Sequence, residues 1–314
     1  MEYFIWIAPA LALSFLLLFL LPTTLLSSII YTKLLVRTSK RKWGRECSIP
    51  DDEEYRKMFD IGLQWDDRYA SRKRPVEVRS GRFRLVGEYF DFASDKAVII
   101  IAGRMESLLY SYYFAEPYRK AGYNVLVIDN RAHGESDGII NSLGFREYKD
   151  ILVWGRLLHD TLGNKSIVLH GICIGSSTGL FALTHPSCPA YFTGLVAEGM
   201  YTTFGESFVN HMKVDHRPLF PFAAETELYM LLFSGANVVS DGPVKRIRNM
   251  RKPVLFLHSR EDVFSTPEQA EKLFDLCPAE NKKLVWFEKG DHSRIRINDT
   301  PGYDRNILDF LERL

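Results

Sequence analysis

The sequence predicts an α/β fold with a mostly parallel, doubly wound sheet, preceded by one transmembrane helix. Short runs rich in Val, Ile, Leu and Phe alternate with segments of helical periodicity from residue 76 onward. A long uncharged apolar stretch lies near the N-terminus. One strand-like run ends in a cysteine between two glycines, which is typical of a tight strand-to-helix turn.

The first element is the apolar stretch from Tyr3 to Leu21. As a helix it would span about 28 Å, close to the thickness of a bilayer core, about 30 Å. Glu2 is the only charged residue before it, whereas a cleaved signal peptide begins with basic residues. We therefore expect residues 1–32 to form a transmembrane anchor, whose apolar helix is kinked or ended by Pro22.

Basic residues follow the anchor, and they set its expected orientation. They are Lys33, Arg37, Lys40, Arg41, Lys42 and Arg45. The positive-inside tendency puts them, and the domain that follows, in the cytoplasm. Anionic lipid headgroups are their expected partners, because a net charge of +1 argues against a nucleic-acid surface. Residues 33–75 form this juxtamembrane segment and a connector helix, whose apolar stripe from Tyr55 to Leu63 is expected to pack on the next domain.

Residues 76–314 are predicted to form one large domain. Its strand-like runs are 76–79, 83–92, 98–102, 124–129, 167–170, 194–198, 254–258 and 284–287. The four cysteines show no paired metal-type spacing, and a reducing cytoplasm disfavours disulfides. Residues 200–250 exceed what one crossover helix needs and are rich in aromatic side chains, which favours a small helical lid over an apolar pocket. An ordinary pair of packed helices explains that segment equally well.

The glycine-flanked cysteine is Cys173, in Gly171-Ile172-Cys173-Ile174-Gly175. The β-branched run before it ends at His170 and a helix follows, so Cys173 sits beside a helix N-terminus that favours a negatively charged sulfur. A second reading uses Gly175-Ser176-Ser177-Thr178-Gly179. It fits less well because Ser177 would lie inside the helix. Cys173 can also be a small buried residue at a tight turn.

The order of the candidate catalytic residues along the chain supports a catalytic role for this turn. Asp262 follows the strand-like run ending at His258, and His292 follows the run ending at Phe287. Two other carboxylates compete for the role of the acid. They are Glu198, at the end of the sixth run, and Asp291, directly before the histidine.

The order of nucleophile, acid and histidine resembles that of the α/β-hydrolase superfamily. The resemblance extends to the D-x-R-x-H-G-x-S pattern from Asp129 to Ser136 and to Gly103 after the third strand. It implies an eight-stranded α/β-hydrolase fold with a helical lid. Cys in place of the usual Ser, and Ala102 where many members have His, depart from the family pattern.

The resemblance also implies roles for the site residues. His292 would take the thiol proton from Cys173 while Asp262 orients the imidazole. The backbone N–H groups of Ile174 and Arg104 would form the oxyanion hole. The Arg104 side chain can also pair with a carboxylate or phosphate of the substrate, or remain a solvated loop arginine.

A thiol nucleophile and an anchor favour a membrane-bound enzyme that cleaves a lipophilic ester, thioester or lactone through a thioester intermediate. Cys-bearing members of the superfamily also include acyltransferases, so transfer is an alternative. A non-catalytic binding protein of this fold is a second alternative. No cofactor or metal is expected, since the lid residues His211, Asp215 and His216 lack a fourth ligand.

Overall fold

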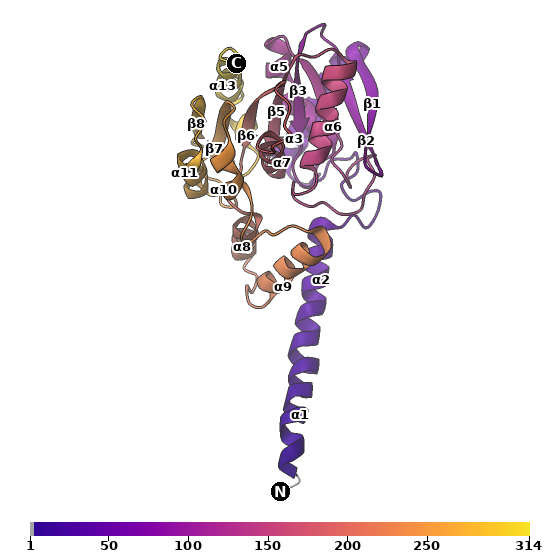
Figure 1. Cartoon of the computed structure of the whole chain (residues 1–314), viewed down its shortest axis with the longest axis vertical. Helices are drawn as coiled ribbons and strands as arrows, with labels where there is room; N and C mark the ends of the chain where they lie inside the picture. Colours follow the sequence, from indigo (N-terminus) through magenta and orange to yellow (C-terminus); the bar gives the residue numbers. More distant parts are fainter. Residues whose placement is uncertain (1–2) are drawn as a thin grey trace.

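The computed structural model describes residues 3–314, with side chains from Ile7 onward, so Met1 and Glu2 of the expected anchor lie outside the described residues. Figure 1 shows a twisted sheet covered by helices, with one long helix projecting from it toward the N-terminus. The sheet has eight strands in the order β1-β2-β4-β3-β5-β6-β7-β8. β2 is antiparallel to β1 and β4, and the other pairs are parallel.

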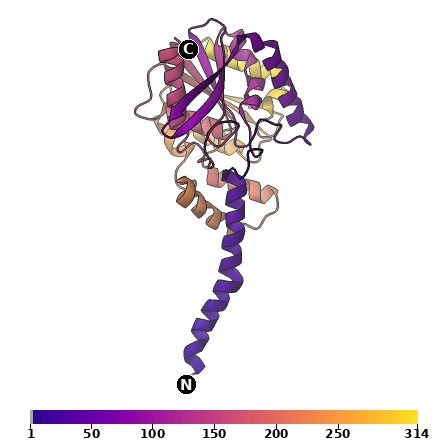
Figure 2. The ribbon, with the colours of Figure 1, turned by 90° about the vertical axis from the view of Figure 1, so that its right-hand side faces the viewer.

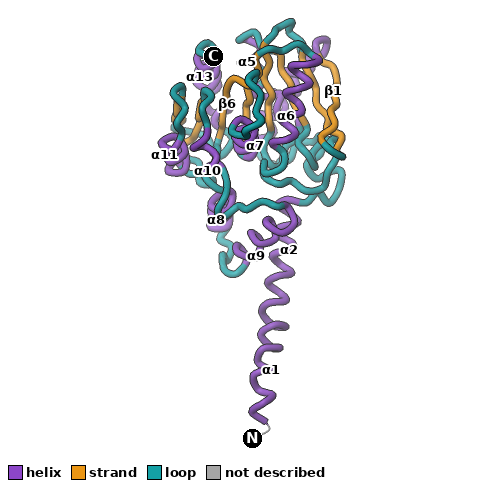
Figure 3. The backbone as a smooth tube through the Cα atoms, in the orientation of Figure 1, coloured by secondary structure: helices purple, strands orange, loops and turns teal. Residues whose placement is uncertain are grey.

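All eight predicted strands are confirmed, with ends that differ by a few residues. They are β1 (Lys73–Ser80), β2 (Phe83–Phe90), β3 (Lys96–Ile101), β4 (Asn124–Ile128), β5 (Ser166–Ile172), β6 (Phe192–Glu198), β7 (Val254–Ser259) and β8 (Lys282–Phe287). The parallel strands end at the same edge of the sheet, which faces the long N-terminal helix (Figure 3). Loops at this edge are where catalytic residues of such sheets are found.

Helices cover both faces of the sheet, and each face has its own apolar core. One face is covered by α3 (Glu53–Arg68), α4 (Leu108–Ser111), α5 (Glu116–Lys120), α12 (Ile295–Asn298) and α13 (Thr300–Leu311). The other is covered by α6 (Tyr148–Arg156), α7 (Ile174–Leu183), α10 (Pro243–Arg246) and α11 (Pro267–Leu276). The inner strands β3 to β7 are almost fully buried, as their continuous apolar runs predict, whereas the edge strands β1 and β8 are partly exposed.

The connector helix α3 begins where the sequence indicates. The Asp52 side chain accepts a hydrogen bond from the Tyr55 backbone N–H at 2.9 Å, which caps the first turn. Tyr55, Met58 and Trp65 are buried against the core of the sheet. Most of the expected stripe therefore packs on the domain, but Leu63 is exposed and Trp65 is buried in its place.

The N-terminal helix is longer than the sequence suggests. It runs through α1 (Tyr3–Phe15), a π-helical turn (Leu16–Leu20) and α2 (Leu21–Leu35). Pro22 lies at the start of α2 and does not end the helix, because the π-helical turn before it shifts the hydrogen-bond pattern that proline interrupts. The 29 residues from Ile7 to Leu35 are apolar enough to cross a membrane, and they span about 43 Å.

The segment that would form the expected lid, which we call the lid, is shorter than residues 200–250. It consists of α8 (Phe204–Val214), α9 (Phe222–Tyr229) and a π-helical turn (Met230–Ser234), whereas α10 returns to the sheet core. In Figures 1 and 2, α9 lies beside α2. Glu225 of α9 accepts hydrogen bonds from the hydroxyls of Thr23 (2.9 Å) and Ser27 (2.7 Å). The end of the N-terminal helix is thus bound to the lid.

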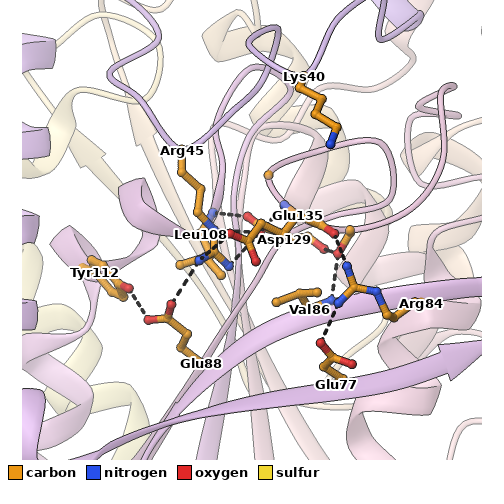
Figure 4. A network of polar contacts seen from close by, with 12 residues as sticks. Lys40, Arg45, Glu77, Arg84, Val86, Glu88, Leu108, Tyr112, Asp129 and Glu135 are labelled. Atoms are coloured by element: carbon orange, nitrogen blue, oxygen red, sulfur yellow. Dashed lines mark hydrogen bonds and ion pairs between the residues drawn. The ribbon is translucent and has the colours of Figure 1, made fainter.

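The folded unit also begins before the expected boundary at Val76. Arg45 binds the buried Asp129 carboxylate at 3.0 Å and Glu88 at 3.3 Å (Figure 4). Arg37 and Lys42 donate to backbone carbonyls of Gly134 and the end of α2. A sequence pattern could not show the contacts of Arg37 and Arg45, because each joins residues far apart in the chain.

Candidate active site

The turn between β5 and α7 has the strained geometry expected at Cys173. This residue has φ 54° and ψ −114°, a conformation that L-amino acids rarely adopt. A Cβ on Gly171 would lie 2.2 Å from the Ser176 nitrogen. One on Gly175 would lie 2.1 Å from the Ile101 oxygen. Both glycines are therefore required, and the turn packs directly against the end of β3.

Ser177, the alternative nucleophile, lies inside α7 and is fully buried. The neighbouring Ser176 hydroxyl donates to the carbonyls of Gly171 (2.6 Å) and Glu198 (2.9 Å) and braces the turn. The geometry thus has Cys173 at the tip of the turn and both serines in the helix.

Asp262 and His292 come together at the same edge of the sheet. Asp262 follows β7, and its Oδ1 accepts the backbone N–H groups of Phe264 (2.9 Å) and Ser265 (2.8 Å). His292 follows β8, and its Nδ1 donates to Asp262 Oδ2 at 2.7 Å. Only 2% of the Asp262 side chain and 14% of the His292 side chain are exposed. The carboxylate is fixed by the backbone and in turn fixes the imidazole.

The two groups shift each other's pKa. Burial lowers the pKa of His292, but the charge of Asp262, followed by that of Cys173, raises it well above its usual value. Burial raises the pKa of Asp262, and His292 more than offsets this, so the pKa of that carboxyl is lowered. The site therefore favours a protonated imidazole that is hydrogen-bonded to the Asp262 carboxylate.

Neither competing acid is hydrogen-bonded to His292. Glu198 is fully buried and accepts a hydrogen bond from the Tyr303 hydroxyl. Burial raises the pKa of Glu198 to about 7. Asp291 is exposed at the surface. Within residues 3–314, Asp262 is the carboxylate that hydrogen-bonds His292.

The two backbone amides expected to form an oxyanion hole lie on adjoining loops. Ile174 is the first residue of α7, where an amide has no acceptor within the helix. Arg104 lies in the loop after β3, and its carbonyl accepts a hydrogen bond from His133 Nε2 at 2.7 Å. Because Gly175 packs on the end of β3, the start of α7 and the loop that carries Arg104 are neighbours.

The Arg104 side chain joins the site to the N-terminal helix. Its Nη1 donates to the Leu34 carbonyl at 3.3 Å, at the end of α2 where the helix dipole favours a cation. Burial lowers the pKa of Arg104, and the nearby Cys173 and Glu106 partly oppose this effect. Arg104 is therefore a half-buried cation held at the end of α2 and not a fully solvated loop residue.

Two further residues border the site, although the sequence did not assign them to it. Tyr201 is buried, and its pKa is raised by burial and by the neighbouring Cys173. His211 of α8 stacks on Phe264 with ring centroids 3.7 Å apart. Burial, with His292 and Arg104 nearby, lowers the pKa of His211 to about 4. The helical periodicity of the lid and its aromatic content were the only signals for these residues.

Comparisons with known proteins agree with this architecture. A family model described as the alpha/beta hydrolase fold matches residues 96–204. The uncharacterized protein YqkD of Bacillus subtilis is 27% identical over 220 residues, which cover 69% of this chain and 71% of YqkD. The uncharacterized membrane protein YNL320W of Saccharomyces cerevisiae is 25% identical over 197 residues, which cover 62% of each chain.

Among solved structures, the esterase Pf2001 of Pyrococcus furiosus is similar, with a TM-score of 0.68. The match covers 79% of this chain and 93% of the esterase, at 23% sequence identity. At that identity the likeness concerns the fold, which the two chains share.

Proposed function

We propose that this chain, which has the α/β-hydrolase fold, is a membrane-anchored hydrolase that cleaves an ester or thioester of a lipophilic acyl group. Cys173, His292 and Asp262 would act as nucleophile, base and orienting acid. The observation that carries the proposal is the 2.7 Å hydrogen bond between His292 and Asp262, together with the strained Cys173 beside the same ring.

The reaction would proceed through a thioester. The Cys173 sulfur attacks the acyl carbonyl, and His292 gives a proton to the departing alcohol or thiol. The oxyanion formed during attack would accept hydrogen bonds from the backbone N–H groups of Ile174 and Arg104. Water, deprotonated by His292, then attacks the thioester, releases a carboxylic acid and restores the thiol.

An anchored topology is part of the proposal. The apolar helix from Ile7 to Leu35 and the basic residues after it support a single crossing with the catalytic domain in the cytoplasm. Protease added to sealed cells should leave the domain intact, and protease added after lysis should digest it. Digestion from outside sealed cells would reverse the orientation.

Kinetic measurements on three variants test whether Cys173 is the nucleophile. Cys173→Ala should abolish turnover of an ester and thioester panel, and Cys173→Ser should retain weak activity because a hydroxyl depends more on its base. Ser177→Ala, the matched control in α7, should keep activity within about twofold of the wild type, since Ser177 does not reach the reacting atoms in this scheme. Activity in Cys173→Ala and loss in Ser177→Ala would overturn the assignment.

The same assay separates hydrolysis from acyl transfer. If water is the acceptor, product release should continue at a steady rate, and added amines, alcohols or thiols should not change it. A burst followed by acceptor-dependent release would make the chain an acyltransferase. Hydrolysis is preferred because Pf2001, with the same fold, is named an esterase.

A further inference from the structure

A cavity of about 480 Å³ lies between α2 and the lid, a volume in the range of small-molecule sites. Its first wall is one face of the N-terminal helix, formed by Leu26, Ile29, Ile30 and Leu34. Their spacing of three and four residues places them on a common side of α2. Leu26, Ile29 and Ile30 belong to the segment expected to form the anchor, whereas Leu34 lies just after it.

The opposite wall belongs to the lid. Phe204, Phe208 and Met212 of α8 are buried behind the cavity, and Phe222 of α9 lies beside them. With the α2 face, they line a mostly apolar space that also meets the charged side chains of Lys33, Asp215 and Arg217. Leu26 and Leu34 are two helical turns apart, so the space extends about 12 Å along α2.

The inner end of the cavity meets the candidate active site. Arg104 lines the cavity and binds the Leu34 carbonyl at 3.3 Å, while its charge interacts with Cys173. His211 also lines the cavity and stacks on Phe264, the residue whose backbone N–H binds Asp262. A chain lying in the cavity would therefore direct its polar end to Arg104 and the sulfur.

The outer side of the lid is apolar and exposed. Leu228 (51%), Leu231 (45%), Leu232 (63%) and Phe233 (54%) lie in or just after α9, next to exposed leucines of α2. Such a contiguous apolar surface marks an interaction site. Because α9 is bound to α2, this surface would meet the hydrocarbon region of a membrane that the N-terminal helix crosses.

Polar contacts hold this lid surface against α2. Besides the two bonds of Glu225, the Tyr31 hydroxyl lies 3.0 Å from the Ser234 hydroxyl. The Tyr229 hydroxyl donates to the Thr24 carbonyl at 3.1 Å. The lid and α2 thus form one unit whose internal space is the cavity.

We infer that this cavity binds the hydrocarbon chain of a membrane lipid, which enters from the bilayer between α2 and the lid and brings its acyl carbonyl to Cys173. The anchor would then be one wall of the substrate site as well as a tether. The inference rests on the proposed function for the fate of the acyl group, but binding of the chain itself does not require catalysis.

Bulky substitutions on α2 in the full-length chain test the inference. Ile30→Trp, and Leu26→Trp nearer the outer end, fill the cavity, whereas Leu25→Trp adds the same bulk at a residue that is 61% exposed. For para-nitrophenyl palmitate in mixed micelles, the first two should lower kcat/KM by roughly tenfold or more, because several methylene groups lose their site. Leu25→Trp should leave kcat/KM for this substrate unchanged.

Short substrates provide the control for folding. All three variants should hydrolyse para-nitrophenyl acetate within about twofold of the wild-type rate, since an acetyl group does not enter the cavity. An equal loss on acetate and palmitate, or no loss on palmitate in either cavity variant, would overturn the inference.

Photolabelling gives a readout that does not depend on catalysis. In a Cys173→Ala background, a palmitic acid probe carrying a diazirine should label the α8 peptide containing Phe208 and Met212. Labelling should fall with Ile30→Trp and remain with Leu25→Trp. If labelling follows this pattern while Cys173→Ala is still active, the proposed nucleophile is wrong and the binding site stands. Equal α8 labelling in all variants would overturn the site.

Discussion

The sheet edge that carries the candidate site and the lid with the N-terminal helix differ in how their side chains are held. At the sheet edge, Asp262 has 3% of its surface exposed and accepts three hydrogen bonds, two of them from the backbone. In the lid, Phe220 is 80% exposed and Leu232 is 63% exposed. Few polar contacts bind the lid to α2.

This difference matches two separate tasks. Nucleophilic catalysis needs groups fixed within a fraction of an ångström, and buried hydrogen bonds to strand ends provide this. Exchange of a lipophilic substrate needs a region that opens, and elements with few buried contacts open at low free-energy cost. Variants at the sheet edge should therefore change the rate of catalysis strongly. Variants in the lid should change the access of substrate to the site.

The largest effect is expected at the sheet edge. Asp262→Asn keeps the shape of the side chain but removes the charge that raises the pKa of His292. It should lower kcat by about 10²- to 10⁴-fold, as loss of the orienting acid does in such triads. Asp291→Asn, adjacent to the same histidine and exposed, is the matched control and should stay within about twofold of wild type. The reverse result would make Asp291 the acid.

An effect of intermediate size is expected on protein stability. It involves Glu198, which is buried at the end of β6, beneath the same edge of the sheet. Because burial raises the pKa of Glu198 to about 7 from 4.5, folding favours its neutral form. The stability that this gives the protein is full below pH 4.5 and is lost as the pH rises through about 7. Glu198→Gln should abolish that loss, which amounts to about 3 kcal/mol.

Thermal unfolding between pH 4.5 and 8 measures this difference. The wild-type Tm should fall relative to that of Glu198→Gln as the pH rises. Tyr303→Phe removes a hydrogen bond that lowers the pKa of Glu198, so it should move the loss to higher pH. Parallel Tm curves for wild type and Glu198→Gln would show that Glu198 is ionised throughout.

The smallest effect is expected in the lid. Glu225→Ala removes two hydrogen bonds to α2, each worth about 1 kcal/mol. Amide hydrogen exchange in α9 should become roughly tenfold faster or more, with no change at the Asp262 loop. Glu227→Ala is the control, because that carboxylate lies near Gly205 of α8 and not against α2. Equal protection of α9 in Glu225→Ala and wild type would mean that the lid and anchor are not held by these bonds.

The sequence predicts the sheet edge well because its signals are local. β-Branched runs define the strands, and parallel strands bring their ends to one edge. Asp262 and His292 follow such ends directly, and glycines flank Cys173 because space requires them. Each inference depends on neighbours in the chain, so the geometry could be anticipated without a structure.

The lid and anchor were predicted less well because their contacts join distant segments. Mean hydropathy treats α2 as uniformly apolar and hides its protein-facing side. The signal that could have revealed it is Thr23, Ser27 and Tyr31, spaced four residues apart on one face of an apolar helix. The pairing of Arg45 with Asp129 has no comparable signal, since it depends on how the chain folds back.

The central claim, a thioester on Cys173, can be tested by rapid acid quench and mass spectrometry of the full-length protein mixed with a palmitoyl thioester. The wild type should gain one palmitoyl group on the peptide containing Cys173, removable by hydroxylamine, and Cys173→Ala should gain none. Turnover of the substrate with no adduct on Cys173, or an adduct on Ser177 instead, would contradict the account.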